Sequence, residues 1–132
     1  MLLTEAEREY LSSQFLGRLA TVGPDGTPQN NPVGFWYDPE TGTIDIGGHG
    51  MGASRKFRNV EANGRAAFVV DDIASLNPWR VRGVEFRGWA EALRDQPPLR
   101  PGFSPERIRL HPRRVLSWGL DETAPGMTAR SV

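Results

Sequence analysis

The chain has 132 residues, of which 38% are hydrophobic and 24% charged, and its mean hydropathy is −0.47, as expected for one globular domain over residues 1–132. Sixteen basic residues balance sixteen acidic ones, so no global charge would recruit nucleic acid or a membrane surface. The longest apolar run, residues 66–70, is too short to cross a bilayer. Because the N-terminus also lacks a signal-peptide pattern, we expect a cytoplasmic protein.

The residue types exclude several kinds of site. Without cysteine there is no disulfide, no thiolate nucleophile and no zinc–thiolate cluster. His49 and His111 stand far apart, so we expect no metal site, and no serine–histidine–aspartate arrangement is recognisable. All basic residues except Lys56 are arginine, which draws attention to that one lysine.

The first third of the chain predicts one helix and three strands. Thr4 and Glu7 have the spacing of a capping box, so a helix is expected over residues 5–14. Residues 17–22 alternate in polarity and precede a Pro-Asp-Gly turn, which is typical of a hairpin. An extended run over 29–37, a second turn and an alternating run over 43–46 complete three strands, expected to follow one another as a meander.

The middle of the chain predicts a loop followed by a helix. The glycine-rich stretch 47–52 disfavours regular structure and indicates a loop where the backbone approaches something closely. Ser54 can cap a helix of about ten residues that Gly64 would end.

The last half predicts three further strands. Buried strands are expected over 66–70 and 81–93, the second with a bulge or bend at its glycines. After an exposed connection over 99–105, we expect a corner at His111-Pro112 and a last strand over 115–120. Six strands and two short helices predict a mainly β protein, a six-stranded antiparallel barrel.

The densest polar cluster follows the glycine-rich loop. Ser54, Arg55, Lys56 and Arg58 stand at the predicted start of the second helix, where free backbone N–H groups and the helix dipole favour an anion such as a phosphate. Cations at this end oppose the dipole unless an anion offsets them. A solvated basic face is the alternative interpretation.

Other residues could contact a flat ring. Asn31 and Pro32 lie in an extended run, where proline belongs on an edge strand or beside a ligand and the amide supplies donors and acceptors. Trp79 could stack on a ring, and His49 could hydrogen-bond to one through its loop. Each residue also has a structural alternative. The run with Asn31 and Pro32 could be a simple strand distortion, Trp79 could pack in the core, and His49 could be solvated.

Seven sequence blocks follow one another in a characteristic order: LGRLATV at 16–22, DGTP at 25–28, NNPVGF at 30–35, SRKFRNV at 54–60, RAAFVVDD at 65–72, RGWAE at 87–91 and HPRRVLSWG at 111–119. This series resembles the pyridoxamine 5′-phosphate oxidase-like split-barrel flavoproteins, in the actinobacterial branch of flavin/deazaflavin oxidoreductases that use coenzyme F420. The blocks cover most of the chain, and the series is more specific than any single block.

The resemblance implies a homodimeric split barrel with cofactor sites at the subunit interface. The cofactor phosphate would bind Arg55 and Lys56, with Ser54 and Arg58 in support. The deazaflavin ring would lie along the second strand. Residues implied to contact the ring are Asn31, Pro32, Val33, Gly48, His49 and Trp79.

The implied reaction is hydride transfer between F420 and a small conjugated or quinone-like substrate, with the redox chemistry supplied by the cofactor. No catalytic acid or base is assigned. The chain is short and has no separate residues suited to a second phosphate-bearing substrate, which argues against pyridoxamine phosphate oxidation. Two alternatives stay open: an FMN-dependent flavin reductase or oxidase, and a non-catalytic flavin- or F420-binding protein. Whether the loop over 94–105 gates the site is also open.

Overall fold

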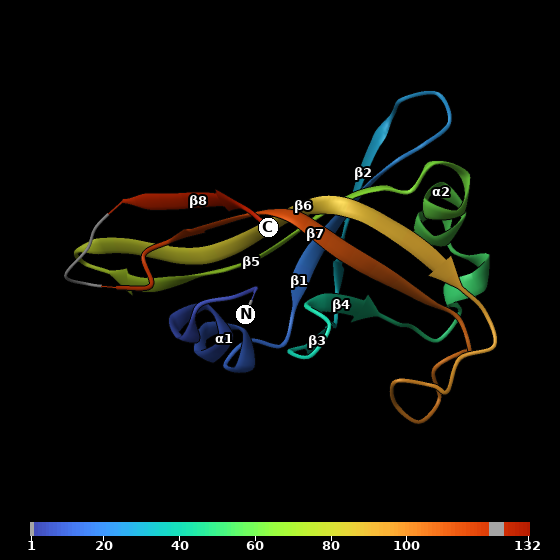
Figure 1. The fold of residues 1–132 in the computed structure, drawn as a ribbon, viewed down its shortest axis with the longest axis horizontal. Helices are drawn as coiled ribbons and strands as arrows, with labels where there is room; N and C mark the ends of the chain where they lie inside the picture. Colours follow the sequence, from blue (N-terminus) through green and yellow to red (C-terminus); the bar gives the residue numbers. More distant parts are fainter. Residues whose placement is uncertain (1, 122–125) are drawn as a thin grey trace.

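The structure is a computed structural model that describes residues 2–121 and 126–132. Within these residues, eight strands form one curled antiparallel sheet flanked by two short α-helices (Figure 1). The strands are β1 (Gly17–Val22), β2 (Pro28–Val33), β3 (Trp36–Asp38), β4 (Thr43–Ile46), β5 (Arg65–Leu76), β6 (Trp79–Leu93), β7 (Arg107–Trp118) and β8 (Met127–Ser131). The predicted mainly β antiparallel barrel is confirmed, with eight strands in place of six.

The strand order separates elements that follow one another in sequence. The sheet runs β2-β1-β5-β6-β7-β4-β3, and β8 pairs with β7. The β1–β2 and β3–β4 hairpins agree with prediction, but the predicted three-stranded meander is wrong, because β2 and β3 lie at opposite ends of this order. The extended run breaks at Gly34 and Phe35, and the Phe35 ring packs edge-on against Phe68 at 5.3 Å. Between the two hairpins the chain thus packs Phe35 against the core.

Strands β5, β6 and β7 are longer than predicted. The expected corner at His111-Pro112 is wrong, because β7 runs straight through it with only a register shift opposite Arg87 and Gly88. A Cβ on Gly88 would lie 2.0 Å from the carbonyl oxygen of His111, so the close approach of the two strands requires glycine there. Strand β8 was not predicted.

The N-terminal helix α1 (Glu5–Ser12) begins with the predicted capping box, although it ends two residues early. The Thr4 side chain accepts from the Glu7 N–H, and the Glu7 carboxylate accepts from the Thr4 N–H at 2.9 Å. The same buried carboxylate binds Arg130 of β8, which holds both ends of the described chain together.

The second helix, α2 (Arg55–Asn63), begins and ends at the predicted caps, and it packs on the sheet. Ser54 caps its start, and Gly64, with φ 67°, ends it. Phe57 and Val60, one turn apart, are buried in the core formed by the inward side chains of the sheet. A short 3₁₀ turn, η1 (Met51–Ala53), leads into α2 from β4. Helix α2 therefore lies directly after the glycine-rich loop.

Candidate functional site

The start of α2 carries three cations, of which Arg55 interacts electrostatically with Asp25 of the β1–β2 turn. The first turn contains no acidic residue, and Arg55 and Arg58 are exposed while Lys56 is half-buried. Within residues 2–121 and 126–132, none of these three forms an ion pair. The Ser54 hydroxyl accepts from the Phe57 N–H at 3.3 Å. Cations at a helix N-terminus are repelled by the positive end of the helix dipole. An anion bound here would interact favourably with the cations and with the dipole.

A buried amide connects α2 to β2. Asn59 donates from Nδ2 to Oε1 of Gln29 at 3.0 Å. Because side chains alternate along a strand, Gln29, Asn31 and Val33 point to the same face. The structure thus places Asn31, which is exposed, and Val33, which is buried, on the face of β2 that α2 approaches.

Pro32 points to the other face of β2. It pairs with Arg18 of β1, and this outer face carries an open hollow of about 350 Å³ lined by Ala20, Asn30 and Val69 among others. The residues that line this hollow do not include Arg55, Lys56, Gly48 or His49. The predicted ring contacts of β2 are therefore divided between its two faces.

The glycine-rich loop is held by the 94–105 connection. The Ser104 N–H donates to the Gly48 carbonyl at 2.9 Å, and the Ser104 hydroxyl accepts from the Met51 N–H at 3.0 Å. His49 is exposed, and its Nδ1 lies 3.1 Å from the Gly102 carbonyl oxygen, which can only accept. An Nδ1–H donor leaves His49 Nε2 available to a ligand.

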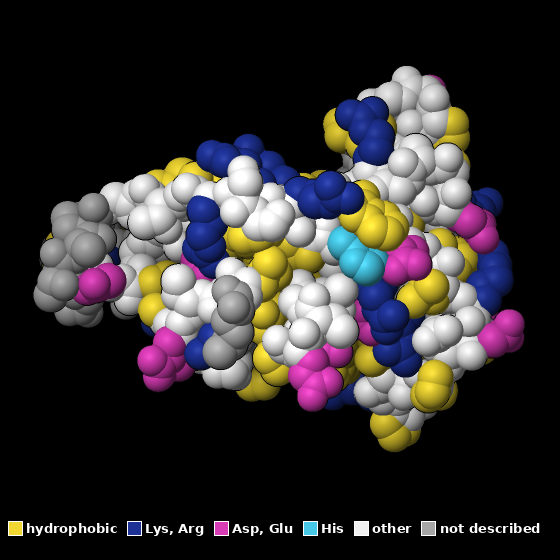
Figure 2. Space-filling model, in the orientation of Figure 1, with side chains coloured by type: hydrophobic (Ala, Val, Ile, Leu, Met, Phe, Trp, Pro, Cys, Tyr) yellow, Lys and Arg dark blue, Asp and Glu magenta, His cyan; other side chains and the backbone are white. Residues whose placement is uncertain are grey.

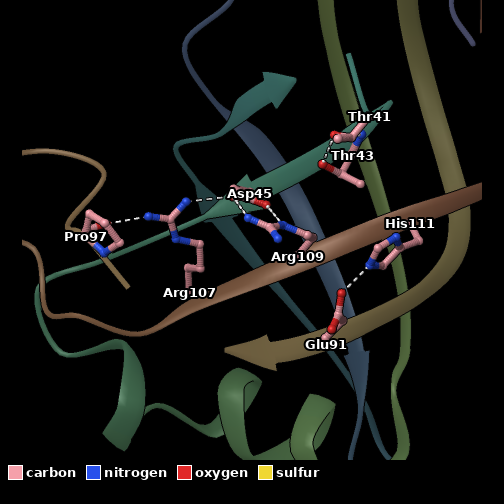
Figure 3. Close-up of polar contacts among 8 residues, drawn as sticks. All are labelled: Thr41, Thr43, Asp45, Glu91, Pro97, Arg107, Arg109 and His111. Atoms are coloured by element: carbon pink, nitrogen blue, oxygen red, sulfur yellow. Dashed lines mark hydrogen bonds and ion pairs between the residues drawn. The ribbon is translucent and has the colours of Figure 1, made fainter. Parts of the chain in front are cut away.

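An ion-pair cluster anchors the base of that connection (Figure 3). The Asp45 carboxylate on β4 accepts from Arg109 Nε at 2.8 Å and from Arg107 Nη1 at 2.8 Å, and Arg107 also donates to the Pro97 carbonyl. Burial acts to raise the pKa of Asp45, but the hydrogen bonds from both arginines outweigh it and hold the pKa below its ordinary value. Sequence reasoning missed this cluster, since its members are about sixty residues apart.

His111 belongs to a surface cluster on β6 and β7. Its Nε2 donates to the Glu91 carboxylate at 2.5 Å, and its ring stacks on Trp89 at 4.1 Å. Figure 2 shows a histidine beside acidic and basic side chains on this face. Because one ring nitrogen and one ring face are engaged inside the protein, this histidine has a structural explanation.

Trp79 lies far from the other predicted residues of its own chain. It pairs with Leu76 at the turn of the β5–β6 hairpin, and β5 begins just after α2. At about 3.3 Å per residue, the length of β5 separates Trp79 from the end of α2 by roughly 36 Å. Figure 1 shows α2 and this turn at opposite ends of the molecule. One chain therefore does not bring Trp79 to Lys56.

A metal-binding cluster and a membrane-spanning helix are both absent from the described residues. In residues 2–121 and 126–132, no group of three or more histidine, aspartate or glutamate side chains is arranged to hold a metal ion. No helix among these residues has the length and apolar character needed to cross a membrane.

Residues 3–129 match the model of the family described as pyridoxamine 5′-phosphate oxidase. A curated relative from Streptomyces rimosus subsp. rimosus, a 5a,11a-dehydrotetracycline/5a,11a-dehydrooxytetracycline reductase, is 48% identical over 137 residues, covering 100% of this chain and 94% of the relative. A solved structure of an F420 reductase has a TM-score of 0.65 and 27% identity, covering 86% of this chain and 98% of that one. The conserved hypothetical protein Rv2991 from Mycobacterium tuberculosis shares the fold, with a TM-score of 0.71, 24% identity, and coverage of 96% and 91%.

Proposed function

Because this chain belongs to the pyridoxamine 5′-phosphate oxidase family, we propose that it is a reductase that uses reduced coenzyme F420 to saturate a conjugated double bond in a fused-ring substrate. The family and the named reductase relative support oxidoreductase function. Identity of 48% over the whole chain supports a substrate like that of the relative. The solved F420 reductase supports the choice of cofactor.

The observation that carries the proposal is the cation cluster at the start of α2, whose members form no ion pair among the residues that the structure describes. Arg55, Lys56 and Arg58 offer a phosphate charged donors, and the exposed helix start adds backbone N–H groups. These donors suit the phosphate of F420 and equally that of FMN. The chemistry of the residues present therefore fits a phosphorylated ring cofactor.

We assign the ring to the edge of β2, beside Asn31 and Val33. The exposed Asn31 amide can pair with ring carbonyl and N–H groups. We also assign Gly48 and His49 to the ring, since their loop runs directly into α2 and His49 Nε2 could accept from a ring N–H. Pro32 would contribute through its backbone, since its side chain faces away.

When bound, reduced F420 supplies a hydride to one carbon of the double bond, while water supplies a proton to the other and the deazaflavin is oxidised by two electrons. The chain's own contribution is to fix ring and substrate in contact. The 94–105 connection serves this purpose by holding His49 through the Gly102 carbonyl.

The proposal includes a homodimer. The β5–β6 turn exposes apolar side chains, with Leu76 74% and Trp79 64% accessible, and such a patch favours burial against another surface. A second copy is also the means by which Trp79 reaches a cofactor held by Lys56.

The test is a titration of the purified protein with F420 and with FMN, followed by tryptophan fluorescence, and an assay of F420H2 oxidation with a 5a,11a-dehydrotetracycline. We expect micromolar F420 binding, weaker FMN binding, and turnover. FMN binding alone would favour the flavin reductase alternative, and F420 binding without turnover a binding protein. Failure of both cofactors to bind would overturn the proposal.

A further inference from the structure

A second hollow lies between α1 and β3. It has a volume of about 400 Å³, and its walls include the consecutive side chains Phe35, Trp36 and Tyr37 together with Arg8 and Gln14 of the first helix and its end. Ligand pockets for small molecules have volumes of about 300–1,000 Å³ and mostly apolar walls with a few polar groups. This hollow has both properties.

Trp36 connects the hollow to the glycine-rich loop. Its ring meets Phe103 edge-on, with centroids 5.9 Å apart, and Phe103 meets His49 in the same manner at 5.0 Å. One phenyl ring therefore separates Trp36 from His49. Trp36 also follows Val33 by three residues, and a Cβ on Gly34 would lie 3.9 Å from its ring. The hollow thus adjoins the position assigned above to the cofactor ring.

The polar groups of the hollow favour a flat, acidic enol or phenol. Arg8 is fixed, because its Nη1 donates to the Leu3 carbonyl at 3.0 Å, and its guanidinium adds positive charge beside the aromatic walls. Burial raises the pKa of Tyr37, so its hydroxyl stays protonated as a donor. Aromatic faces bind flat rings by stacking, and a cation at their edge suits an enolate.

We propose that this hollow binds the fused rings of the substrate, and that Trp36 determines specificity for extended ring systems over single-ring enones. The proposal rests on the proposed function for the identity of the reaction. It adds the place where the substrate binds and the residues that select it.

The test uses tetracycline, a stable compound with the fused-ring skeleton, as a direct binding probe for the protein with and without F420. In a folded Trp36→Ala variant, tetracycline affinity should fall about tenfold, as expected for a lost stacking partner, while F420 affinity stays unchanged. In the same variant, KM for a fused-ring substrate should rise about tenfold, whereas kcat/KM for a single-ring enone should not change.

The matched control is Trp89→Ala, which removes a half-exposed tryptophan stacked on His111 away from the hollow. It should bind tetracycline like the wild type. If Trp36→Ala does not fold, Trp36→Phe should keep affinity within about twofold and Arg8→Gln should lower it, since one retains a flat ring and the other removes the cation.

The outcomes separate the two proposals. Tetracycline binding that depends on Trp36 or Arg8, without any F420 binding, would support the hollow and remove the proposed reaction. F420 binding and turnover with unchanged tetracycline affinity in folded Trp36→Ala and Arg8→Gln variants would overturn the hollow alone. The same conclusion follows if the wild type binds no tetracycline in either state.

Discussion

Asn59 of α2 and Gln29 of β2 are joined by a 3.0 Å hydrogen bond from Nδ2 to Oε1, and Asn59 is buried. The same amide nitrogen lies 3.1 Å from the Thr21 hydroxyl on β1. This contact fixes the helix that carries Lys56 against the strand that carries Asn31. The proposed phosphate and ring contacts therefore depend on one buried amide for their relative position.

Asn59→Ala should reduce both stability and cofactor affinity. Leaving buried partners unsatisfied costs about 1–3 kcal/mol in the free energy of unfolding, measured by urea denaturation. F420 affinity should fall as well, because α2 is no longer tied to β2. The control is Asn63→Ala, whose amide donates to the Val22 carbonyl of β1 but not to β2. Equal losses of F420 affinity in the two variants would contradict this role.

Lys56→Gln should weaken cofactor binding without unfolding the protein. Loss of a charged hydrogen bond corresponds to about 1.5–3 kcal/mol of binding free energy. Lys56 has no ion pair among the described residues, so its removal leaves no orphaned carboxylate. Arg65→Gln, an exposed cation beyond the other end of α2, is the control. A calorimetric titration in which both variants match the wild type would remove Lys56 from the site.

Stability should decrease on acidification because of Glu7. Burial acts to raise its pKa, but hydrogen bonds from Arg130 and the Thr4 backbone lower the pKa below its ordinary value of 4.5. A carboxyl with a lowered pKa in the folded state stabilises it above the unfolded pKa, and this contribution disappears as pH falls through the folded pKa. Each pKa unit corresponds to about 1.4 kcal/mol.

Urea denaturation of wild type and Glu7→Gln at pH 7 and pH 3 measures this contribution. The variant should be less stable at pH 7, and the gap should narrow at pH 3, because the contribution of the Glu7 charge begins to fall once pH drops below the unfolded pKa and is lost through the folded pKa. A gap that is the same at both pH values would show that the Glu7 charge does not contribute.

Local signals predicted the elements that local interactions determine. The Thr4–Glu7 capping box and the Ser54 and Gly64 caps depend on residues within a few positions, and these helix boundaries are nearly correct. The two hairpins are likewise visible in their turns. The position of β3 in the sheet could not be predicted from local signals, because no residue near Gly34 indicates which end of the sheet the chain joins next.

The candidate site divides in the same way. The cations of α2 are adjacent in sequence and could be identified there, and the contiguous loop places Gly48 and His49 next to them. The contacts of His49 with Gly102 and Phe103 arise from a loop some fifty residues later, and only the fold brings them together. Pro32 and Trp79 were predicted from residue type. Strand alternation turns the Pro32 side chain to the other face of β2, and Trp79 lies at the turn of the β5–β6 hairpin, far from α2.

Asp45→Asn should loosen the connection that holds His49. The substitution removes the charge that Arg107 and Arg109 share, and Arg107 then loses the partner that positions it on the Pro97 carbonyl. Removing one partner of a buried ion pair costs roughly 3 kcal/mol, the lower end of the usual range because Arg109 is partly exposed. Asp38→Asn, an exposed carboxylate on the same hairpin, is the control. Amide hydrogen exchange over residues 97–105 should accelerate in Asp45→Asn only, with weaker F420 binding, since a loop freed at its base opens more often. Unchanged exchange there, despite reduced global stability, would mean that Ser104 and Gly102 hold the loop without help from Asp45.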